Sequence, residues 1–149
     1  MTKFLLAVHV LAAIVAIGPV TVAASMFPPA ARRALAAPDD TRATETLQLL
    51  HRICRVYAVV GVVVPVFGFA TASSMRVLGS AWLIVSIALT ALAALVLATL
   101  VLPAQTALVE GAGTREKTAR LAMFTGVFNL LWAAVTILMI VRPGSTTGA

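Results

Sequence analysis

Four long stretches without a charged residue constrain the fold of this chain more than any other feature of its sequence. They cover approximately residues 4–26, 56–75, 80–102 and 121–141. An α-helix rises about 1.5 Å per residue, so each stretch can cross a hydrocarbon core about 30 Å thick. Lipid offers the backbone no hydrogen-bond partner, whereas a helix satisfies its own backbone groups. We therefore predict an all-α fold, an integral membrane protein built as an antiparallel four-helix bundle.

The composition agrees with this assignment and leaves room for one domain. The chain has 149 residues, of which 61% are hydrophobic and 11% charged, whereas soluble domains carry about 25% charged residues. The four stretches use most of the length, so residues 1–149 are predicted to form a single transmembrane domain. The alternative for the first stretch is a signal peptide cleaved near "VAAS", but its apolar run is longer than signal sequences usually contain.

The distribution of basic residues predicts the orientation in the membrane. Five of the eleven lysines and arginines lie between the first and second stretches, and three lie between the third and fourth. The other three, Lys3, Arg76 and Arg142, belong to the opposite side. Because cytoplasmic loops are rich in Lys and Arg, we expect both larger loops inside a bacterial cytoplasmic (inner) membrane and both termini outside. The net charge of +6 then reflects topology and contact with the lipid bilayer, and no nucleic-acid partner is expected.

An amphipathic segment precedes the second stretch. From about residue 44, apolar residues recur at three- and four-residue spacing: Leu47, Leu50, Cys54 and Tyr57. This spacing predicts a cytoplasmic lead-in turn that continues into the membrane helix. His51, Arg52 and Arg55 lie between these positions, and we predict that they meet lipid headgroup phosphates. Cys54 is the single cysteine, so it cannot form an internal disulfide and is expected to be a packed, reduced thiol.

Proline and glycine mark the predicted bends and ends of the helices. Gly18 and Pro19 predict a kink in the first helix, because proline lacks an N–H and clashes with the preceding turn. The segment "FPPAARRALAAPDD" predicts the end of that helix. Gly61 and Pro65 predict a bend in the second stretch.

Few polar groups lie inside the four stretches. None of the stretches contains Asp, Glu, Lys or Arg, which excludes proton-coupled small multidrug exporters because those proteins need a membrane-embedded carboxylate. Small residues recur at every fourth position of the third helix, a pattern that lets membrane helices approach closely: Ser86, Thr90, Ala94 and Ala98. Asn129, with Thr125 on its face, predicts a contact between helices. The alternative is a small-molecule carrier with a polar site near Asn129.

His9 is the one titratable side chain in the first stretch. It shares a helix face with small residues such as Ala12, Ala13 and Ala16, so we expect it to point into the bundle. We interpret it as a neutral histidine that forms a hydrogen bond across helices; the alternative is a ligand of haem or copper. His51 is predicted about 20 Å away along the membrane normal, too far to share one iron with His9. No cofactor is expected.

Two segments carry a resemblance to known membrane proteins. "FLLAVHVLAAIVAIGPVTVAASMFP" and "RLAMFTGVFNLLWAAVTILMIVRPG" resemble a family of uncharacterised actinobacterial four-helix integral membrane proteins, a domain of unknown function. The likeness covers nearly the whole chain and implies the fold and the membrane location. The "HV" pair at His9 is more distantly similar to copper-resistance D-type membrane proteins, which implies a metal or haem role for His9. The Trp-x-Gly that commonly follows that histidine is absent here.

The residues favour a small polytopic inner-membrane protein without enzymatic activity. We expect an accessory or scaffold protein that assembles as a homo-oligomer or within a larger membrane complex. The alternatives are a haem- or copper-associated redox protein that uses His9, and a small-molecule carrier with its site near Asn129.

Overall fold

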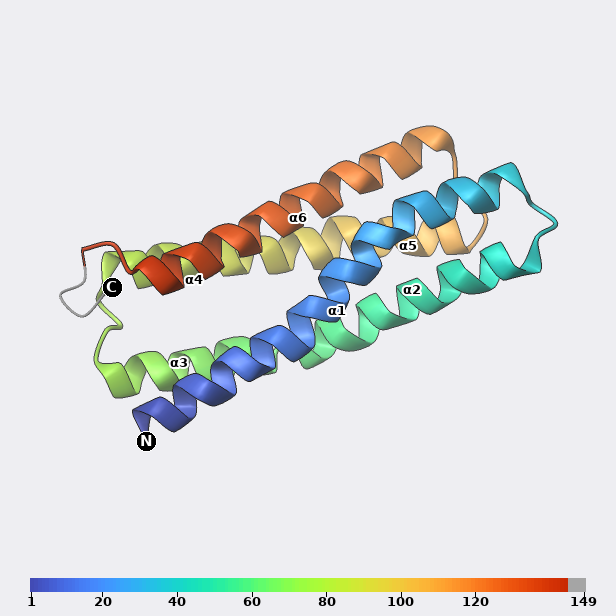
Figure 1. The fold of residues 1–149 in the computed structure, drawn as a ribbon. Helices are drawn as coiled ribbons and strands as arrows, with labels where there is room; N and C mark the ends of the chain where they lie inside the picture. Colours follow the sequence, from blue (N-terminus) through green and yellow to red (C-terminus); the bar gives the residue numbers. More distant parts are fainter. Residues whose placement is uncertain (145–149) are drawn as a thin grey trace.

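Every regular element of residues 1–144, the part of the chain that the computed structural model describes, is helical (Figure 1). A five-residue π-helical segment, η1, joins α4 to α5. The elements are α1 (Thr2–Ala36), α2 (Thr41–Val60), α3 (Val63–Met75), α4 (Ala81–Val96), η1 (Leu97–Val101), α5 (Leu102–Val109) and α6 (Arg115–Val141).

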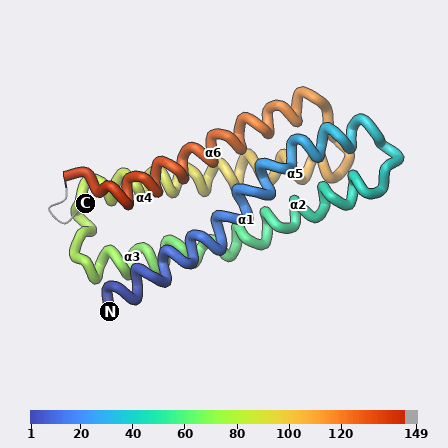
Figure 2. Tube along the Cα trace, in the orientation of Figure 1, coloured from blue at the N-terminus to red at the C-terminus, as the bar shows by residue number. Residues whose placement is uncertain are grey.

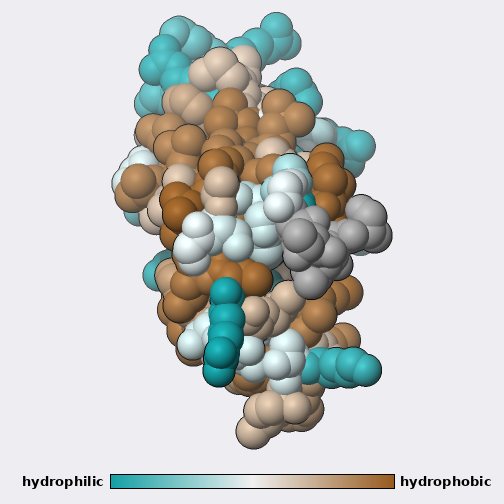
Figure 3. All heavy atoms as spheres, turned by 90° about the vertical axis from the view of Figure 1, so that its left-hand side faces the viewer, coloured by the Kyte–Doolittle hydropathy of each residue, from teal (hydrophilic) through white to brown (hydrophobic). Residues whose placement is uncertain are grey.

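Four helical units are long and apolar enough to cross a membrane, judged by length and composition. They are Thr2–Ala36, Thr41–Met75, Ala81–Val109 and Arg115–Val141. The prediction of an all-helical chain with four membrane-length apolar helices is thus confirmed. Figure 3 shows apolar side chains across the middle of the face that it presents, with hydrophilic ones gathered along its upper edge and others projecting near its lower end.

The helix α1 lies at the centre of the arrangement. It contacts α3 and α2 along one side, and it contacts α6 as well (Figure 1). Thr2 at its start forms a hydroxyl–hydroxyl hydrogen bond with Ser74 near the end of α3. Figure 2 shows the N-terminus and the end of α6 at one end of the molecule, with the turns before α2 and α6 at the other.

The first helix is longer than predicted, because α1 continues through Pro28 and Pro29 to Ala36. Each proline leaves the carbonyl four residues earlier without its usual N–H donor, which disfavours a helix. Packing outweighs this cost here, since Phe27, Pro28 and Ala31 are buried in the main core. The helix does end within "FPPAARRALAAPDD", but ten residues, nearly three turns, beyond the predicted limit at about residue 26. The actual turn covers only residues 37–40.

The predicted bend in the second stretch is present as a break between α2 and α3. Gly61 N–H donates to the Tyr57 carbonyl, but Val62 N–H donates three residues back, to Val59. Pro65 has no N–H to donate to the Gly61 carbonyl, and Val64 N–H donates to it instead. Because the hydrogen bonds to the residue four positions back are interrupted here, α2 ends and α3 begins as a separate helix.

The third helix also continues past its predicted end at residue 102. Pro103 cannot donate a backbone bond, and η1 directly precedes it, with Leu102 N–H donating to the Leu97 carbonyl five residues back. The wider turn keeps Leu97, Val101 and Gln105 on the buried side at four-residue spacing. As a result α5 brings its polar residues into the packed part of the molecule.

The side of α4 that faces its neighbours differs from the predicted small-residue stripe. Ser86 is buried and Thr90 is half-buried, but Ala94 and Ala98 are exposed. The buried positions instead include Ala93, Val96 and Leu97. An α-helix has 3.6 residues per turn, so positions exactly four residues apart rotate steadily around its axis. The four predicted positions therefore do not share one face.

Candidate functional site

A buried polar cluster joins α2 to α5. The His51 Nδ1 atom lies 3.0 Å from Gln105 Oε1, and His51 Nε2 lies 3.2 Å from Thr106 Oγ1. Gln105 Nε2 in turn donates to Cys54 Sγ at 3.5 Å. Gln105 and Cys54 are fully buried, and His51 is 8% exposed. These four side chains, called the His51 cluster below, form the most extensive side-chain hydrogen-bond network in residues 1–144.

The amide of Gln105 and the hydroxyl of Thr106 hold the His51 ring from its two nitrogens. Because Gln105 Nε2 donates to Cys54, the amide oxygen accepts from His51 Nδ1–H. The Thr106 hydroxyl has one proton and two acceptors in reach, His51 Nε2 and the Leu102 carbonyl at 3.0 Å. This one hydroxyl therefore links the His51 ring on α2 to the backbone of α5.

The structure separates His51 from the two arginines with which it was grouped. Arg52 and Arg55 are exposed, as contact with headgroups requires, whereas His51 points inward to Gln105. The assignment of His51 to lipid headgroups is therefore corrected. The helical spacing explains the difference, since His51 follows Leu47 by four residues and precedes Cys54 by three, on the buried face. Sequence reasoning missed Gln105 and Thr106 because it placed them beyond the third helix.

An open groove of about 920 Å³ lies beside the His51 cluster. Nine of its ten lining residues come from α2, and the tenth is Val109 at the end of α5. Polar and basic side chains line the part that is nearest the start of α2, and valines line the other part. The lining residues are Glu45, Gln48, Leu49, His51, Arg52, Arg55, Val56, Val59, Val60 and Val109.

His9 joins α1 to α3. Its Nδ1 atom lies 2.9 Å from the Val64 carbonyl oxygen, just after the break between α2 and α3. A carbonyl only accepts, so Nδ1 carries a proton and donates it to Val64. The ring rests on Gly68, where an added Cβ would lie 2.9 Å from His9 Cε1. His9 thus makes the hydrogen bond across helices that its sequence context predicts.

A second polar region lies between α1 and α6. Asn129 Nδ2 donates to Ser25 Oγ at 3.0 Å, so Asn129 bridges the two helices. Around this bond, four buried side-chain atoms have no hydrogen-bond partner in residues 1–144, namely Thr21 Oγ1, Thr125 Oγ1, Asn129 Oδ1 and Trp132 Nε1. Together they offer both donors and acceptors. Buried polar groups of this kind can bind water or a small neutral molecule.

Two other hydroxyl groups make local bonds only. Ser86 Oγ donates to the Trp82 carbonyl and Thr90 Oγ1 to the Ser86 carbonyl, each at 2.7 Å within α4. Their side-chain bonds therefore stay within one helix, unlike that of Asn129.

Within residues 1–144 no three His, Cys, Asp or Glu side chains gather closely enough to hold a metal ion. Comparisons of the chain with family models, with curated proteins and with solved structures find no match. The resemblance to actinobacterial membrane proteins and to copper-resistance D-type proteins therefore stays a prediction.

Proposed function

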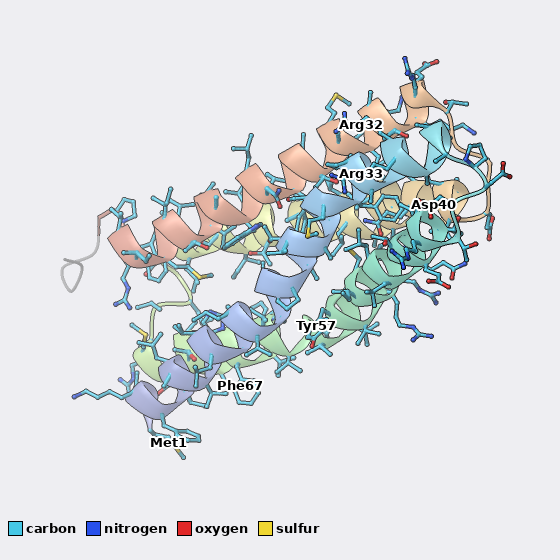
Figure 4. The ribbon with its side chains drawn as sticks, turned by 45° about the vertical axis from the view of Figure 1, so that its right-hand side comes forward. Met1, Arg32, Arg33, Asp40, Tyr57 and Phe67 are labelled. Atoms are coloured by element: carbon cyan, nitrogen blue, oxygen red, sulfur yellow. The ribbon has the colours of Figure 1, made fainter. Side chains whose placement is uncertain are left out.

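We propose that this chain is a multi-pass protein of the bacterial cytoplasmic membrane, with four helices that cross as an antiparallel bundle and both termini outside. The four apolar helices support the placement, and the uneven distribution of basic residues supports the orientation. Figure 4 shows Arg32, Arg33 and Asp40 at the end of the molecule opposite Met1. The charged end would face the cytoplasm.

Cysteine labelling in spheroplasts tests this topology. We expect Gly79→Cys, in the exposed turn before α4, to react with an impermeant maleimide in intact spheroplasts once Cys54 is replaced by alanine. Ala112→Cys, in the exposed turn before α6, is the matched control and should react only after lysis. The reverse pattern would invert the orientation. Extraction of the protein by alkaline carbonate would contradict the membrane placement itself.

Within that membrane the chain acts as a non-enzymatic accessory or scaffold protein, which assembles with itself or with a larger complex. This function rests on the large apolar surface that the helices leave exposed. At most 28% of the residues in each apolar window are buried within the chain. The outer face of α4 combines exposed alanines with larger residues, so a neighbouring helix can approach its backbone closely. Its exposed residues include Ile84, Ala88, Ala91 and Leu95, and the exposed Ala98 follows them in η1.

Cross-linking in native membranes tests the scaffold function. In the Cys54→Ala background, Ala91→Cys coupled to a maleimide-linked benzophenone is expected to give a light-induced adduct, a dimer for self-assembly or a larger species for a complex. Ala70→Cys, an exposed position on α3, is the control and should stay monomeric. If Ala88→Cys, Ala91→Cys and Ala98→Cys all stay monomeric while the protein remains in the membrane, assembly through α4 is wrong.

A further inference from the structure

The groove beside the His51 cluster changes character along α2. Its charged residues, Glu45, Arg52 and Arg55, occupy the first part, and Val56, Val59 and Val60 occupy the second. At about 1.5 Å per residue, Val60 lies about 7.5 Å beyond Arg55 along the helix. The valines are exposed, Val59 by 74%. The groove thus presents a charged part followed by an apolar part over about four helical turns, from Glu45 to Val60.

The arginines of the groove are available to a ligand. Among the described residues the one ion pair joins Arg120 to Glu116, so neither Arg52 nor Arg55 is neutralised by a carboxylate. Glu45 lies two turns before Arg52, about 10 Å along the helix, too far for a direct pair. The fixed charges of the groove are those of two arginines and one glutamate, which leave a single net positive charge.

The His51 cluster ties the groove on α2 to the neighbouring helix α5. His51 lines the groove and also bonds to Gln105 and Thr106 on α5, the helix that ends at Val109. The bonds therefore fix the distance between α2 and the end of α5. A groove with fixed walls is better suited to a defined ligand than an exposed pair of arginines on a flexible loop would be.

We propose that this groove binds one anionic diacyl phospholipid. Arg52 and Arg55 would contact the phosphodiester, whose single negative charge balances the net positive charge of the groove. An acyl chain would lie along Val56, Val59 and Val60. The order of charge and apolar surface along α2 matches the order of headgroup and acyl chain in a membrane leaflet. The proposal rests on the membrane placement proposed above, and it is independent of assembly through α4.

Lipid titration followed by native mass spectrometry tests the proposal. The purified full-length protein in detergent is titrated with short-chain phosphatidylglycerol, and the bound lipid is counted. We expect R52Q/R55Q to weaken binding about thirtyfold, since each basic residue near a membrane surface contributes about fivefold in affinity. R32Q/R33Q removes the same charge from exposed residues of α1 outside the groove and should change binding less than about twofold.

Further binding measurements identify the ligand. V59N removes an acyl contact without changing charge and should weaken phosphatidylglycerol binding. Glycerol 3-phosphate, which offers the phosphate alone, should not displace the lipid at equal concentration. Equal losses in R52Q/R55Q and R32Q/R33Q would overturn the site, and so would equal binding of phosphatidylcholine by the wild type. Displacement by glycerol 3-phosphate would point to a free phosphate ester. All variants change exposed side chains, and unchanged unfolding midpoints show that they fold.

Discussion

Replacing Gln105 by leucine is expected to lower the free energy of unfolding in detergent by about 1–3 kcal/mol. The substitution removes the acceptor of His51 Nδ1–H and leaves that buried donor without a partner. An unsatisfied buried group loses its hydration without recovering a bond, which is why the cost exceeds that of a typical hydrogen bond. Reversible unfolding of the purified protein, followed by circular dichroism, measures the change.

A double-mutant cycle separates the hydrogen bond from the packing. His51→Leu alone should also destabilise the protein, because it leaves Gln105 Oε1 without a donor. His51→Leu combined with Gln105→Leu should cost less than the sum of the single changes, since neither partner is then left unsatisfied. Thr99→Val is the control, because the exposed Thr99 hydroxyl bonds only to a carbonyl of its own helix. Additive effects of the two leucine substitutions would contradict the bond.

The four helices could be predicted from sequence because membrane insertion is signalled by long apolar runs, which are local features. The ends of the helices could not. Whether α1 stops at Pro28 depends on the burial of Phe27 and Ala31 against α2, which no local pattern reveals. The continuation of α4 into α5 depends on η1, which accommodates Pro103. In both cases tertiary packing outweighed the preference of proline to end a helix.

The polar sites show the same division between local and long-range information. Asn129 was expected to bridge helices, and the pattern around it was enough, because an amide within a long apolar helix has few other hydrogen-bond partners. His51 was misplaced because its neighbours Arg52 and Arg55 dominate the local charge. Its partner Gln105 is 54 residues away in the sequence. Only the three-dimensional arrangement brings those two side chains together.

Replacing Gly68 by alanine is expected to lower the free energy of unfolding by about 1–3 kcal/mol, the typical cost of inserting a group into a packed region. The added Cβ would lie 2.9 Å from His9 Cε1 and 3.3 Å from His9 Nδ1. A free side chain would simply move away. The His9 ring can retreat only by giving up its hydrogen bond to the Val64 carbonyl, so the clash and the bond are coupled.

Gly126→Ala is the matched control for this change. An added Cβ at Gly126 meets no atom within 4 Å, so alanine there should stabilise α6 by about 0.5–1 kcal/mol through its higher helix propensity. His9→Ala should make Gly68→Ala tolerable, because the double variant removes the ring that the Cβ would strike. Equal effects of Gly68→Ala and Gly126→Ala would contradict the contact between α1 and α3. A visible absorption band that His9→Ala abolishes would show that Nε2 binds a chromophore, and His9 would then be a ligand as well as a link between helices.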